Sequence, residues 1–555
     1  MKDNTRQISF LSIAFFASLF CAGIYYEYLS CLMSLLLVSW LFVNHLRKNN
    51  TVIRLNLTTV SFILITFFYG LTAFWAVDSG MAFIGFLKYL PLLLFATALM
   101  QMEEKDTMLL IFPYAITLMT VLSAALAQIT LLEDYFLVSG RLGGFLQHPN
   151  AFAILVLVAE LLLLSKDKIN YYDLICIALL IVGLIYAGDR IVFILAIIAN
   201  VATVLITKSK RFIFFSVLAL LACGFVSVVI LIATENTHIV EKLTHITINK
   251  NAFVGRLLYY TDALPIILKK PFGLGYMGYY YMQSSFQSGV YSTTYIHNDI
   301  LQLILDIGWI PSAIFVFAIL KRIFGKGTHR IHRIILSTLF LHSLFNFNLQ
   351  FLSIFFVYIL FLETDSGKKL VIPNKKWLIC ALASAMACVC LYVGMSLLLC
   401  ETGKFNASYY MYPFNPNAET AILVNSNDIE KANTITTNTL KRNKYLLAAY
   451  TAKGRYAYSK GDFKTLINIK NKAFEIAPFA YEEYEEYARM LINGITLYKQ
   501  TGDAQNKRIC IDELKDIPKK LEKLNDKIGL LGKKINEQPK TKLPDVLIEY
   551  IDSIE

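Results

Sequence analysis

The chain has 555 residues, of which 56% are hydrophobic and only 17% are charged, and its net charge is +12. Soluble domains carry about 25% charged residues, so this composition excludes a disordered chain, a coiled coil and a wholly soluble protein. The positive charge is weak support for a nucleic-acid partner, because residues 1–400 hold 28 Lys and Arg against 19 Asp and Glu among long apolar runs. Cationic loops between such runs usually mark the cytoplasmic side of a membrane.

Apolar runs follow one another through the first 400 residues, and most have the roughly 20 residues that a helix needs to cross the hydrocarbon. We therefore expect an all-α fold, a polytopic membrane protein with about 12–13 transmembrane helices. The runs lie near residues 8–26, 28–46, 57–75, 81–100, 108–130, 149–165, 172–188, 190–207, 211–233, 298–320, 334–346, 348–362 and 377–400.

The distribution of cations predicts the orientation of these runs. If the N-terminus is cytoplasmic, alternate connections hold 20 Lys and Arg, and the opposite short connections hold only Arg141 and Arg190. This asymmetry places 131–148, 188–190 and the long loop 234–297 on the outer side. Both flanks of 334–362 are basic, so we expect two crossings there with a turn near Asn346. A single tilted helix is the alternative, and it would leave the C-terminal region cytoplasmic.

Residues 1–400 form the predicted membrane domain, and 401–555 form a second, helical domain that two crossings at 334–362 would place outside. The composition shifts after 401 towards Lys, Asn, Glu and Tyr. Residues 450–478 resemble one tetratricopeptide repeat, a helix–turn–helix unit of about 34 residues. The match includes Gly454, the turn at Gly461, Ala473 and Pro478. Stacked units of this kind leave a concave surface suited to large partners.

Polar clusters on the predicted outer side are the candidates for function, since ionisable groups at span ends are either topological signals or functional groups. Each cluster also has an ordinary explanation: a helix cap, an arginine reaching lipid phosphate, a loop surface, or a hydrogen bond between helices. The candidates are Arg141, Gln147 and Asn150 in the first cluster, Arg190 in the second, Arg256, His297 and Asn298 in the long loop, and His342 with Asn346 in the last.

The recurrence of these groups on one side suggests chemistry on a lipid-linked phosphate at the outer leaflet. Guanidinium groups grip phosphate bidentately. A histidine near neutral pKa is suited to act as a general base. No Asp or Glu array with metal-ligand spacing occurs in the long loop, so we expect neither a metal nor a cofactor.

In this order the clusters resemble the O-antigen ligase and polymerase superfamily of the Wzy-C type, over about residues 130–365. Two positions depart from the family pattern, because Tyr259 or Tyr260 replaces the usual tryptophan and Asp189 replaces a small polar residue. The resemblance rests on Arg141-x-x-Gly144-Phe145-x-Gln147-His148-Pro149-Asn150, Asp189-Arg190, Gly255-Arg256-x-x-x-Tyr260-x-x-Ala263, Pro271-x-Gly273-x-Gly275, His297-Asn298, Gly308 and His342-Ser343-x-x-Asn346.

The resemblance implies a metal-independent glycosyltransferase of the GT-C kind in the bacterial inner membrane, with its active site facing the periplasm. Such an enzyme moves a glycan from undecaprenyl pyrophosphate to an acceptor hydroxyl. Carried over by motif, His297 is the general base, Arg190 and Arg256 bind pyrophosphate, and Arg141 is a further pyrophosphate-binding candidate. Gln147, Asn150, Asn298 and His342 are expected to line the site.

Three acceptors are compatible with the sequence: the lipid A core, a protein Ser or Thr, and a second lipid-linked unit. The last of these would make the protein a polymerase. The helical C-terminal region favours a large acceptor by analogy. A lipid or glycan transporter is an alternative of a different class, but the sequence lacks the internal duplication typical of transporters. A membrane-bound scaffold would leave the arginines and His297 unexplained. The sugar and the oligomeric state are not indicated.

Overall fold

The computed structural model of the chain describes residues 2–102, 106–207, 250–373 and 375–554. The predicted span 211–233 and the first part of the long loop, up to residue 249, lie outside the described residues. All nine candidate residues named above lie inside them.

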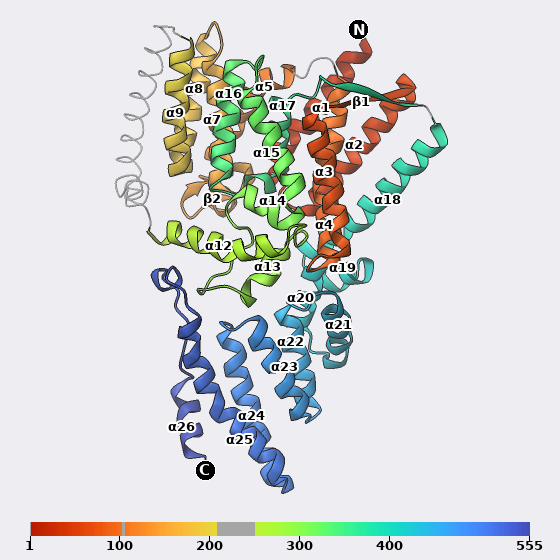
Figure 1. The fold of residues 1–555 in the computed structure, drawn as a ribbon. Coiled ribbons are helices and arrows are strands. Elements are labelled where there is room, and N and C mark those ends of the chain that lie inside the picture. Colours follow the sequence, from red (N-terminus) through yellow and green to blue (C-terminus); the bar gives the residue numbers. More distant parts are fainter. Residues whose placement is uncertain (1, 103–105, 208–249, 374, 555) are drawn as a thin grey trace.

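The regular secondary structure of the described part is helical apart from two short antiparallel strand pairs (Figure 1). In the membrane part the elements are α1 (Lys2–Phe20), α2 (Glu27–Lys48), β1 (Asn50–Leu55), α3 (Leu57–Leu71), α4 (Ser79–Met100), α5 (Asp106–Leu126), α6 (Glu133–Phe136), β2 (Leu137–Val138), β3 (Arg141–Leu142), α7 (Pro149–Leu164), α8 (Tyr171–Ala187), α9 (Arg190–Thr207), α12 (Lys250–Lys269), α13 (Gly278–Met282), α14 (Asp299–Ile307), α15 (Trp309–Phe324), α16 (Arg330–Ser343), α17 (Leu352–Phe361), β4 (Lys368–Pro373) and α18 (Lys376–Glu401). The C-terminal helices are α19 (Phe405–Met411), α20 (Pro416–Asn425), α21 (Ile429–Arg442), α22 (Leu447–Ser459), α23 (Phe463–Ile476), α24 (Tyr481–Thr501), α25 (Ala504–Glu522) and α26 (Asp545–Ser553).

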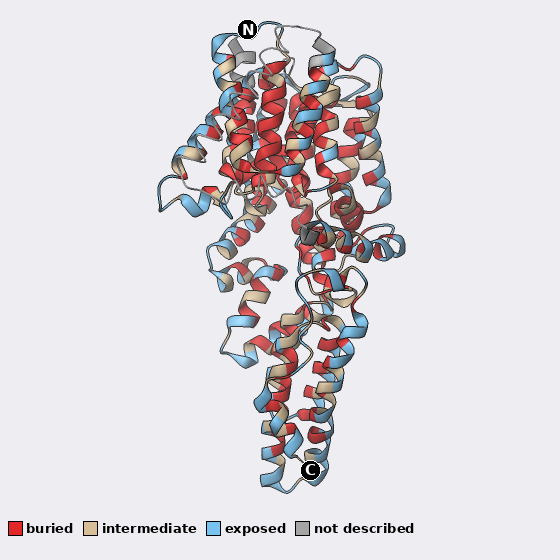
Figure 2. Ribbon diagram, turned by 90° about the vertical axis from the view of Figure 1, so that its left-hand side faces the viewer, coloured by how far each residue is buried: buried red, intermediate tan, exposed pale blue. Residues whose placement is uncertain are grey.

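Most helices of the membrane part coincide with predicted apolar runs, and the prediction of an all-α polytopic membrane protein is confirmed. Within the described ranges, five helices of 18 or more residues are long and apolar enough to cross a membrane: α2, α3 with its following turn, α4, α5 and α18. Shorter apolar helices, among them α7, α8 and α17, pack between them. Figure 2 shows the buried residues concentrated in this bundle.

The run 298–320 is not one continuous span. It forms α14 and α15, which break at Gly308, where φ is +86°. A Cβ at Gly308 would meet the carbonyl oxygen of Pro271 at 2.3 Å, and the amide of Trp309 donates to that same oxygen at 3.0 Å. The apolar pattern could not show this break, because both halves are apolar and the cause lies in the contact with the Pro-x-Gly-x-Gly loop.

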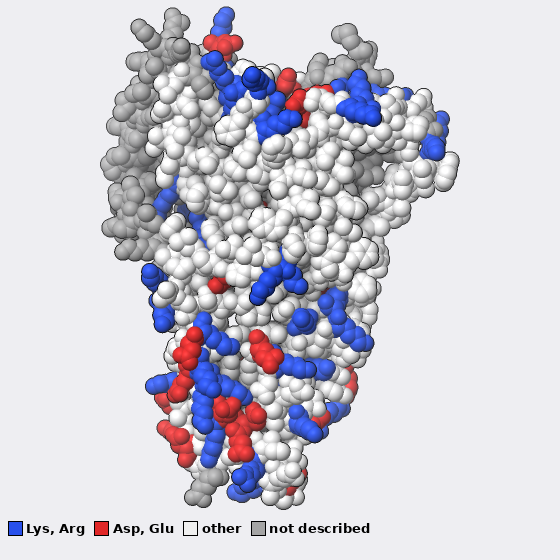
Figure 3. All heavy atoms as spheres, in the orientation of Figure 1, with Lys and Arg blue, Asp and Glu red and all other residues white. Residues whose placement is uncertain are grey.

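The segment 334–362 forms two helices, as predicted from its basic flanks. Helix α16 ends at Ser343 and α17 begins at Leu352. Strands β1 and β4 pair with each other, so residues 50–55 and 368–373 lie at the same end of the bundle. Helix α18 then runs to the opposite end, where α19–α26 follow (Figure 1). Lys and Arg gather along the β1–β4 end, and a band with few charged side chains separates it from the C-terminal helices (Figure 3).

The C-terminal helices pack as successive antiparallel neighbours, with α22 against α23 and α24 against α25. The turn before α23 holds Gly461 at φ +69°, and the Asp462 carboxylate accepts from the Thr465 amide at 3.0 Å. The main buried apolar cluster of the membrane part continues as far as Ala452, and a separate cluster begins at Ala457. The first C-terminal helices therefore share their core with the membrane part, while assignment of the region to tetratricopeptide repeats stays a prediction.

A buried ion cluster joins the two parts. Asp78 caps α4 by accepting from the backbone amide of Met81 at 2.9 Å. Its carboxylate also accepts from the Arg442 guanidinium at 3.1 Å and from the side-chain amide of Asn443 at 3.1 Å. Arg442 donates at the same time to Glu419. Both carboxylates are about 99% buried. Removing the guanidinium would leave two buried carboxylates unpaired, which is the costly way to break an ion pair.

We expect Arg442→Ala to destabilise the docking of α20–α22 on the membrane part by about 3–5 kcal/mol. Thermal unfolding of the purified protein should begin at a lower temperature, and limited proteolysis should cut faster between residues 412 and 446. Arg508→Ala is the matched control, because Arg508 is 85% exposed and pairs only with exposed Asp512. Equal melting and proteolysis of the two variants would contradict this role for Arg442.

Candidate functional site

The turn between α16 and α17 collects buried polar groups from four separate parts of the chain. The Nε2–H of His342 donates to the Asp189 carboxylate at 3.1 Å, since a carboxylate only accepts. The Asn348 side-chain amide donates to the other ring nitrogen, Nδ1, at 2.7 Å. These two bonds fix the ring of His342 in one orientation and leave it no free nitrogen for chemistry.

The first cluster of the sequence joins this network through side chains. Arg141 donates to the Asn150 Oδ1 at 2.7 Å and to the Ala187 carbonyl at 2.8 Å. The Asn150 Nδ2 donates to the Asn346 Oδ1 at 2.9 Å. The Asn346 Nδ2 lies 2.9 Å from the His342 Nε2. Arg141, Asn150 and His342, predicted separately, therefore lie in one connected network with Asp189 and Asn346.

The positive charge of Arg141 in this network is balanced by the carboxylate of Asp189, just before α9. Burial disfavours the charged form of Asp189, but the hydrogen bond from His342 and the charge of Arg141 outweigh it and lower the pKa of Asp189. Arg190 follows directly and is exposed. Its positive charge acts on Arg141, so the two guanidiniums lie near each other at the same end of the bundle.

His297 lies in a strained loop conformation just before α14. Its φ is +57°, a value that non-glycine residues rarely adopt outside functional turns. The Tyr260 hydroxyl donates to the His297 carbonyl at 2.8 Å and lies 3.4 Å from the Leu344 carbonyl. The Nδ1 of His297 is buried and has no hydrogen-bond partner within the described residues. The backbone is thus fixed, while one ring nitrogen is left unpaired.

Helix α12 lies against His297 and presents Arg256, Tyr259 and Tyr260 to it. The ring of Tyr259 stacks on that of His297, with centroids 6.4 Å apart. Burial, reinforced by the positive charge of Arg256, lowers the pKa of His297 to about 4. The imidazole is therefore neutral at pH 7 and able to accept a proton, with a guanidinium close by.

The ring of Phe347 lies between His297 and a second histidine, His148. Its centroid lies 5.0 Å from that of His297 and 4.8 Å from that of His148. The Nδ1 of His148 accepts from the Ala151 amide at 3.2 Å, so the neutral ring carries its proton on Nε2. Burial, with the charges of His297 and Arg141, lowers the pKa of His148 to about 3. The sequence analysis did not propose His148, although it stands between Gln147 and Asn150 in the same motif.

The Pro-x-Gly-x-Gly loop leads to a buried lysine that the sequence analysis also missed. Gly273 and Gly275 have φ near +80°, and a Cβ on Gly273 would meet the Asp306 carbonyl oxygen at 2.4 Å. The loop then places the Tyr276 hydroxyl 2.8 Å from Lys88 Nζ and 3.0 Å from the Tyr295 hydroxyl, two residues before His297. A lysine within an apolar run is itself a sign of function or of a buried pair, and here Lys88 pairs with Glu27 at 3.3 Å.

Two predicted lining residues have local structural contacts. Asn298 caps α14, because its Oδ1 accepts from the amides of Ile300 and Leu301 at 3.1 and 3.0 Å. The Gln147 Oε1 accepts from the Tyr26 hydroxyl at 3.4 Å. Among the residues that the structure describes, no group of three or more His, Cys, Asp or Glu side chains could hold a metal ion.

Two groups of candidate residues thus meet at residues 344–348. One is the network of Arg141, Asn150 and His342, and the other is Arg256 with His297 and its tyrosines. Positive charge and a neutral histidine side by side are suited to binding a phosphate group and removing a proton from a hydroxyl.

One part of the chain matches a known protein family. Residues 175–317 match the family model described as O-antigen ligase. The match spans Arg190, Arg256 and His297 and leaves Arg141, Asn150 and His342 outside. Comparisons with curated proteins and with solved structures give no match. Residues 175–317 are therefore similar to the O-antigen ligase (Wzy-C) superfamily, which supports the resemblance predicted from the sequence motifs.

Proposed function

We propose that the protein is a ligase-type glycosyltransferase that moves a glycan from undecaprenyl pyrophosphate to an acceptor hydroxyl on the periplasmic face of the inner membrane. The family match supports ligase or polymerase chemistry in general. The observation that carries the finer proposal is His297, a neutral imidazole with an unpaired buried Nδ1 beside Arg256.

In the proposed step the acceptor oxygen attacks the anomeric carbon of the donor sugar. A new carbon–oxygen bond forms while the bond from that carbon to the pyrophosphate breaks, and the hydroxyl proton passes to His297. The negative charge grows on the leaving pyrophosphate, where guanidinium groups stabilise it most effectively. Arg256 and Arg190 are proposed for this role, and Arg141 is a less direct candidate because Asn150 and the Ala187 carbonyl occupy two of its donors.

A bound pyrophosphate would also adjust the base. The pKa of His297 is about 4, which is low for a general base at neutral pH. Two phosphates nearby favour the protonated imidazole and raise this pKa. Donor binding would therefore strengthen the base at the moment when it is needed.

The orientation of the bundle supports a periplasmic site. The cation-rich β1–β4 end is the cytoplasmic end by the positive-inside rule, and the C-terminal helices lie at the other end (Figures 1 and 3). The 271–297 loop contacts the connection between α25 and α26, since the Gly529 amide donates to the Ser288 carbonyl at 2.8 Å. The acceptor is proposed to be a lipid A core or a protein hydroxyl, and polymerisation of lipid-linked units is the second candidate within the same chemistry.

His297→Ala should lower the rate of glycan transfer by about 10²–10⁴-fold, because the acceptor hydroxyl would lose its base. The measurement is transfer from a lipid-pyrophosphate-linked glycan by the purified protein, with lipopolysaccharide, polymer and glycoprotein products compared. His329→Ala is the matched control, since His329 is exposed in the α15–α16 connection. Full activity of a folded His297→Ala variant would refute the role of His297.

Arg256→Ala should lower kcat/KM for the donor by about 10- to 100-fold. This factor corresponds to the loss of a hydrogen bond to a charged group, which contributes about 1.5–3 kcal/mol. The pH profile gives an independent sign. In the wild type the neutral base is present above pH 4, so kcat/KM should fall only as the pH drops through about 4. Arg256→Ala removes a positive charge that depresses the pKa of His297, so the acid limb should move to higher pH.

Arg256→Lys separates the two effects of this residue. The ammonium keeps the positive charge, so the acid limb should stay near its wild-type position, while the loss of bidentate geometry should still weaken donor binding. An acid limb that does not move in Arg256→Ala would show that Arg256 does not act on His297.

A further inference from the structure

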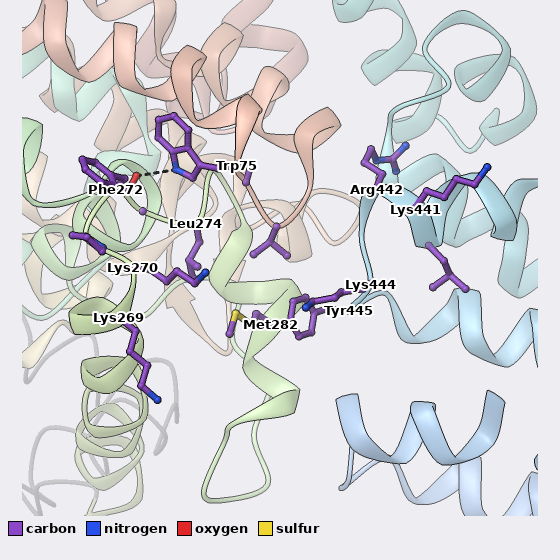
Figure 4. A pocket seen from close by; sticks show the side chains of 15 residues that line it. Trp75, Lys269, Lys270, Phe272, Leu274, Met282, Lys441, Arg442, Lys444 and Tyr445 are labelled. Atoms are coloured by element: carbon purple, nitrogen blue, oxygen red, sulfur yellow. Dashed lines mark hydrogen bonds between the residues drawn. The ribbon is translucent and has the colours of Figure 1, made fainter. Parts of the chain in front are cut away.

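A cavity of about 610 Å³ lies between the membrane part and the C-terminal helices, away from the proposed catalytic residues. One wall comes from residues 269–274, at the end of α12, and the opposite wall comes from residues 440–445, between α21 and α22 (Figure 4). Neither His297 nor Arg190, Arg256 or Arg141 lines it. Its volume is in the range of pockets that bind small ligands.

Positive charge without a counter-charge lines this cavity. Arg442 is already paired with Asp78 and Glu419. The other cations are four lysines, and none of them forms an ion pair within the described residues. Lys270 and Lys444 extend towards each other from the two walls (Figure 4), and Lys444 Nζ lies 5.2 Å from the centroid of the Tyr445 ring. The remaining two are Lys269 and Lys441.

The cavity also has an apolar side at the level of the membrane surface. Trp75 follows α3, a membrane-crossing helix, and its Nε1–H donates to the Phe272 carbonyl at 3.3 Å. Large aromatic side chains stay exposed around this point: Phe74 is 85% exposed, Phe272 55% and Trp309 42%. Aromatic residues at the end of a span are typical of the headgroup region of a bilayer. The lysines therefore meet apolar surface at the boundary between lipid and water.

We propose that this cavity binds the phosphate headgroup of an anionic lipid in the outer leaflet, with Lys270 and Lys444 on the phosphate and Trp75 and Phe272 beside the first part of the acyl chains. An anionic lipid satisfies both features at once, because it brings negative charge to the lysines and apolar chains to the exposed aromatics. A soluble anion would use only the lysines, and a protein segment would not explain the position of the aromatics at the span end.

The site goes beyond the proposed transfer reaction and does not depend on it. The wall formed by residues 271–274 continues into Tyr276, whose hydroxyl bonds to that of Tyr295 next to His297. A lipid held in this cavity would therefore lie against the loop that supports the candidate catalytic histidine, on its other side.

The test uses the full-length protein in phosphatidylcholine nanodiscs that contain increasing fractions of phosphatidylglycerol with brominated acyl chains. Bromine quenches nearby tryptophan fluorescence, and subtraction of the Trp75→Phe variant isolates the signal of Trp75. We expect saturable quenching of Trp75 by brominated phosphatidylglycerol. We expect about tenfold weaker binding in the double variant Lys270→Ala/Lys444→Ala, since each lysine near an anionic lipid contributes about 1 kcal/mol and part of this is lost to screening.

Two comparisons make the result decisive. Lys515→Ala/Lys523→Ala removes two exposed lysines of the C-terminal helices and should bind as the wild type does. His297→Ala should also bind normally, which separates this site from the catalytic proposal. Equal quenching by brominated phosphatidylcholine, unchanged affinity in the Lys270/Lys444 variant, or displacement by millimolar inorganic phosphate would each overturn the proposal, the last by assigning the cavity to free phosphate.

Discussion

Buried polar groups at the turn between α16 and α17 impose the constraint on which the candidate site depends. His342, Asn346 and Asn348 are each at least 98% buried, and a buried polar group without a partner costs about 1–3 kcal/mol. Their partners come from distant parts of the chain, namely Asn150 on α7 and Asp189 before α9. The polar side chains of the turn have all these hydrogen-bond partners only when α7 and the start of α9 are in their native positions.

The same turn fixes the position of the loop that carries His297. The Asp299 carboxylate accepts from the backbone amides of Asn348 and Leu349 at 3.1 and 3.0 Å, which ties the start of α14 to the turn. Phe347 packs against the ring of His297, so a shift of the turn would move the histidine directly. The polar network is therefore best understood as support for the site, and the group left with an unpaired nitrogen, His297, is the one suited to chemistry. This division explains why His342, which is fully buried and has both ring nitrogens engaged, is a poor candidate for a base.

The sequence predicted the spans well because two independent signals agreed. Apolar runs marked the helices, and the 20 cations on alternate connections predict their orientation. The pairing of β1 with β4 agrees with the prediction that residues 50–55 and 368–373 lie on one side. It could not predict the break at Gly308, which depends on a carbonyl oxygen 37 residues earlier in the chain. It also could not separate roles within a motif, because Asn298 caps a helix while its neighbour His297 has a free nitrogen.

The cavity lysines show a different limit of reasoning from composition. Residues 401–555 hold 24 Lys and Arg against 21 Asp and Glu, which reads as a nearly neutral, solvated surface. In the folded chain the acids are used unevenly: Glu483 and Glu486 both pair with Lys470, and Glu419 pairs with Arg442. Lys444 is left facing Lys270 of the membrane part across one cavity, whose lining also includes Lys269 and Lys441. A charge balance that is close to neutral over a region therefore conceals a local excess, and only the contact between two distant segments makes that excess a binding surface.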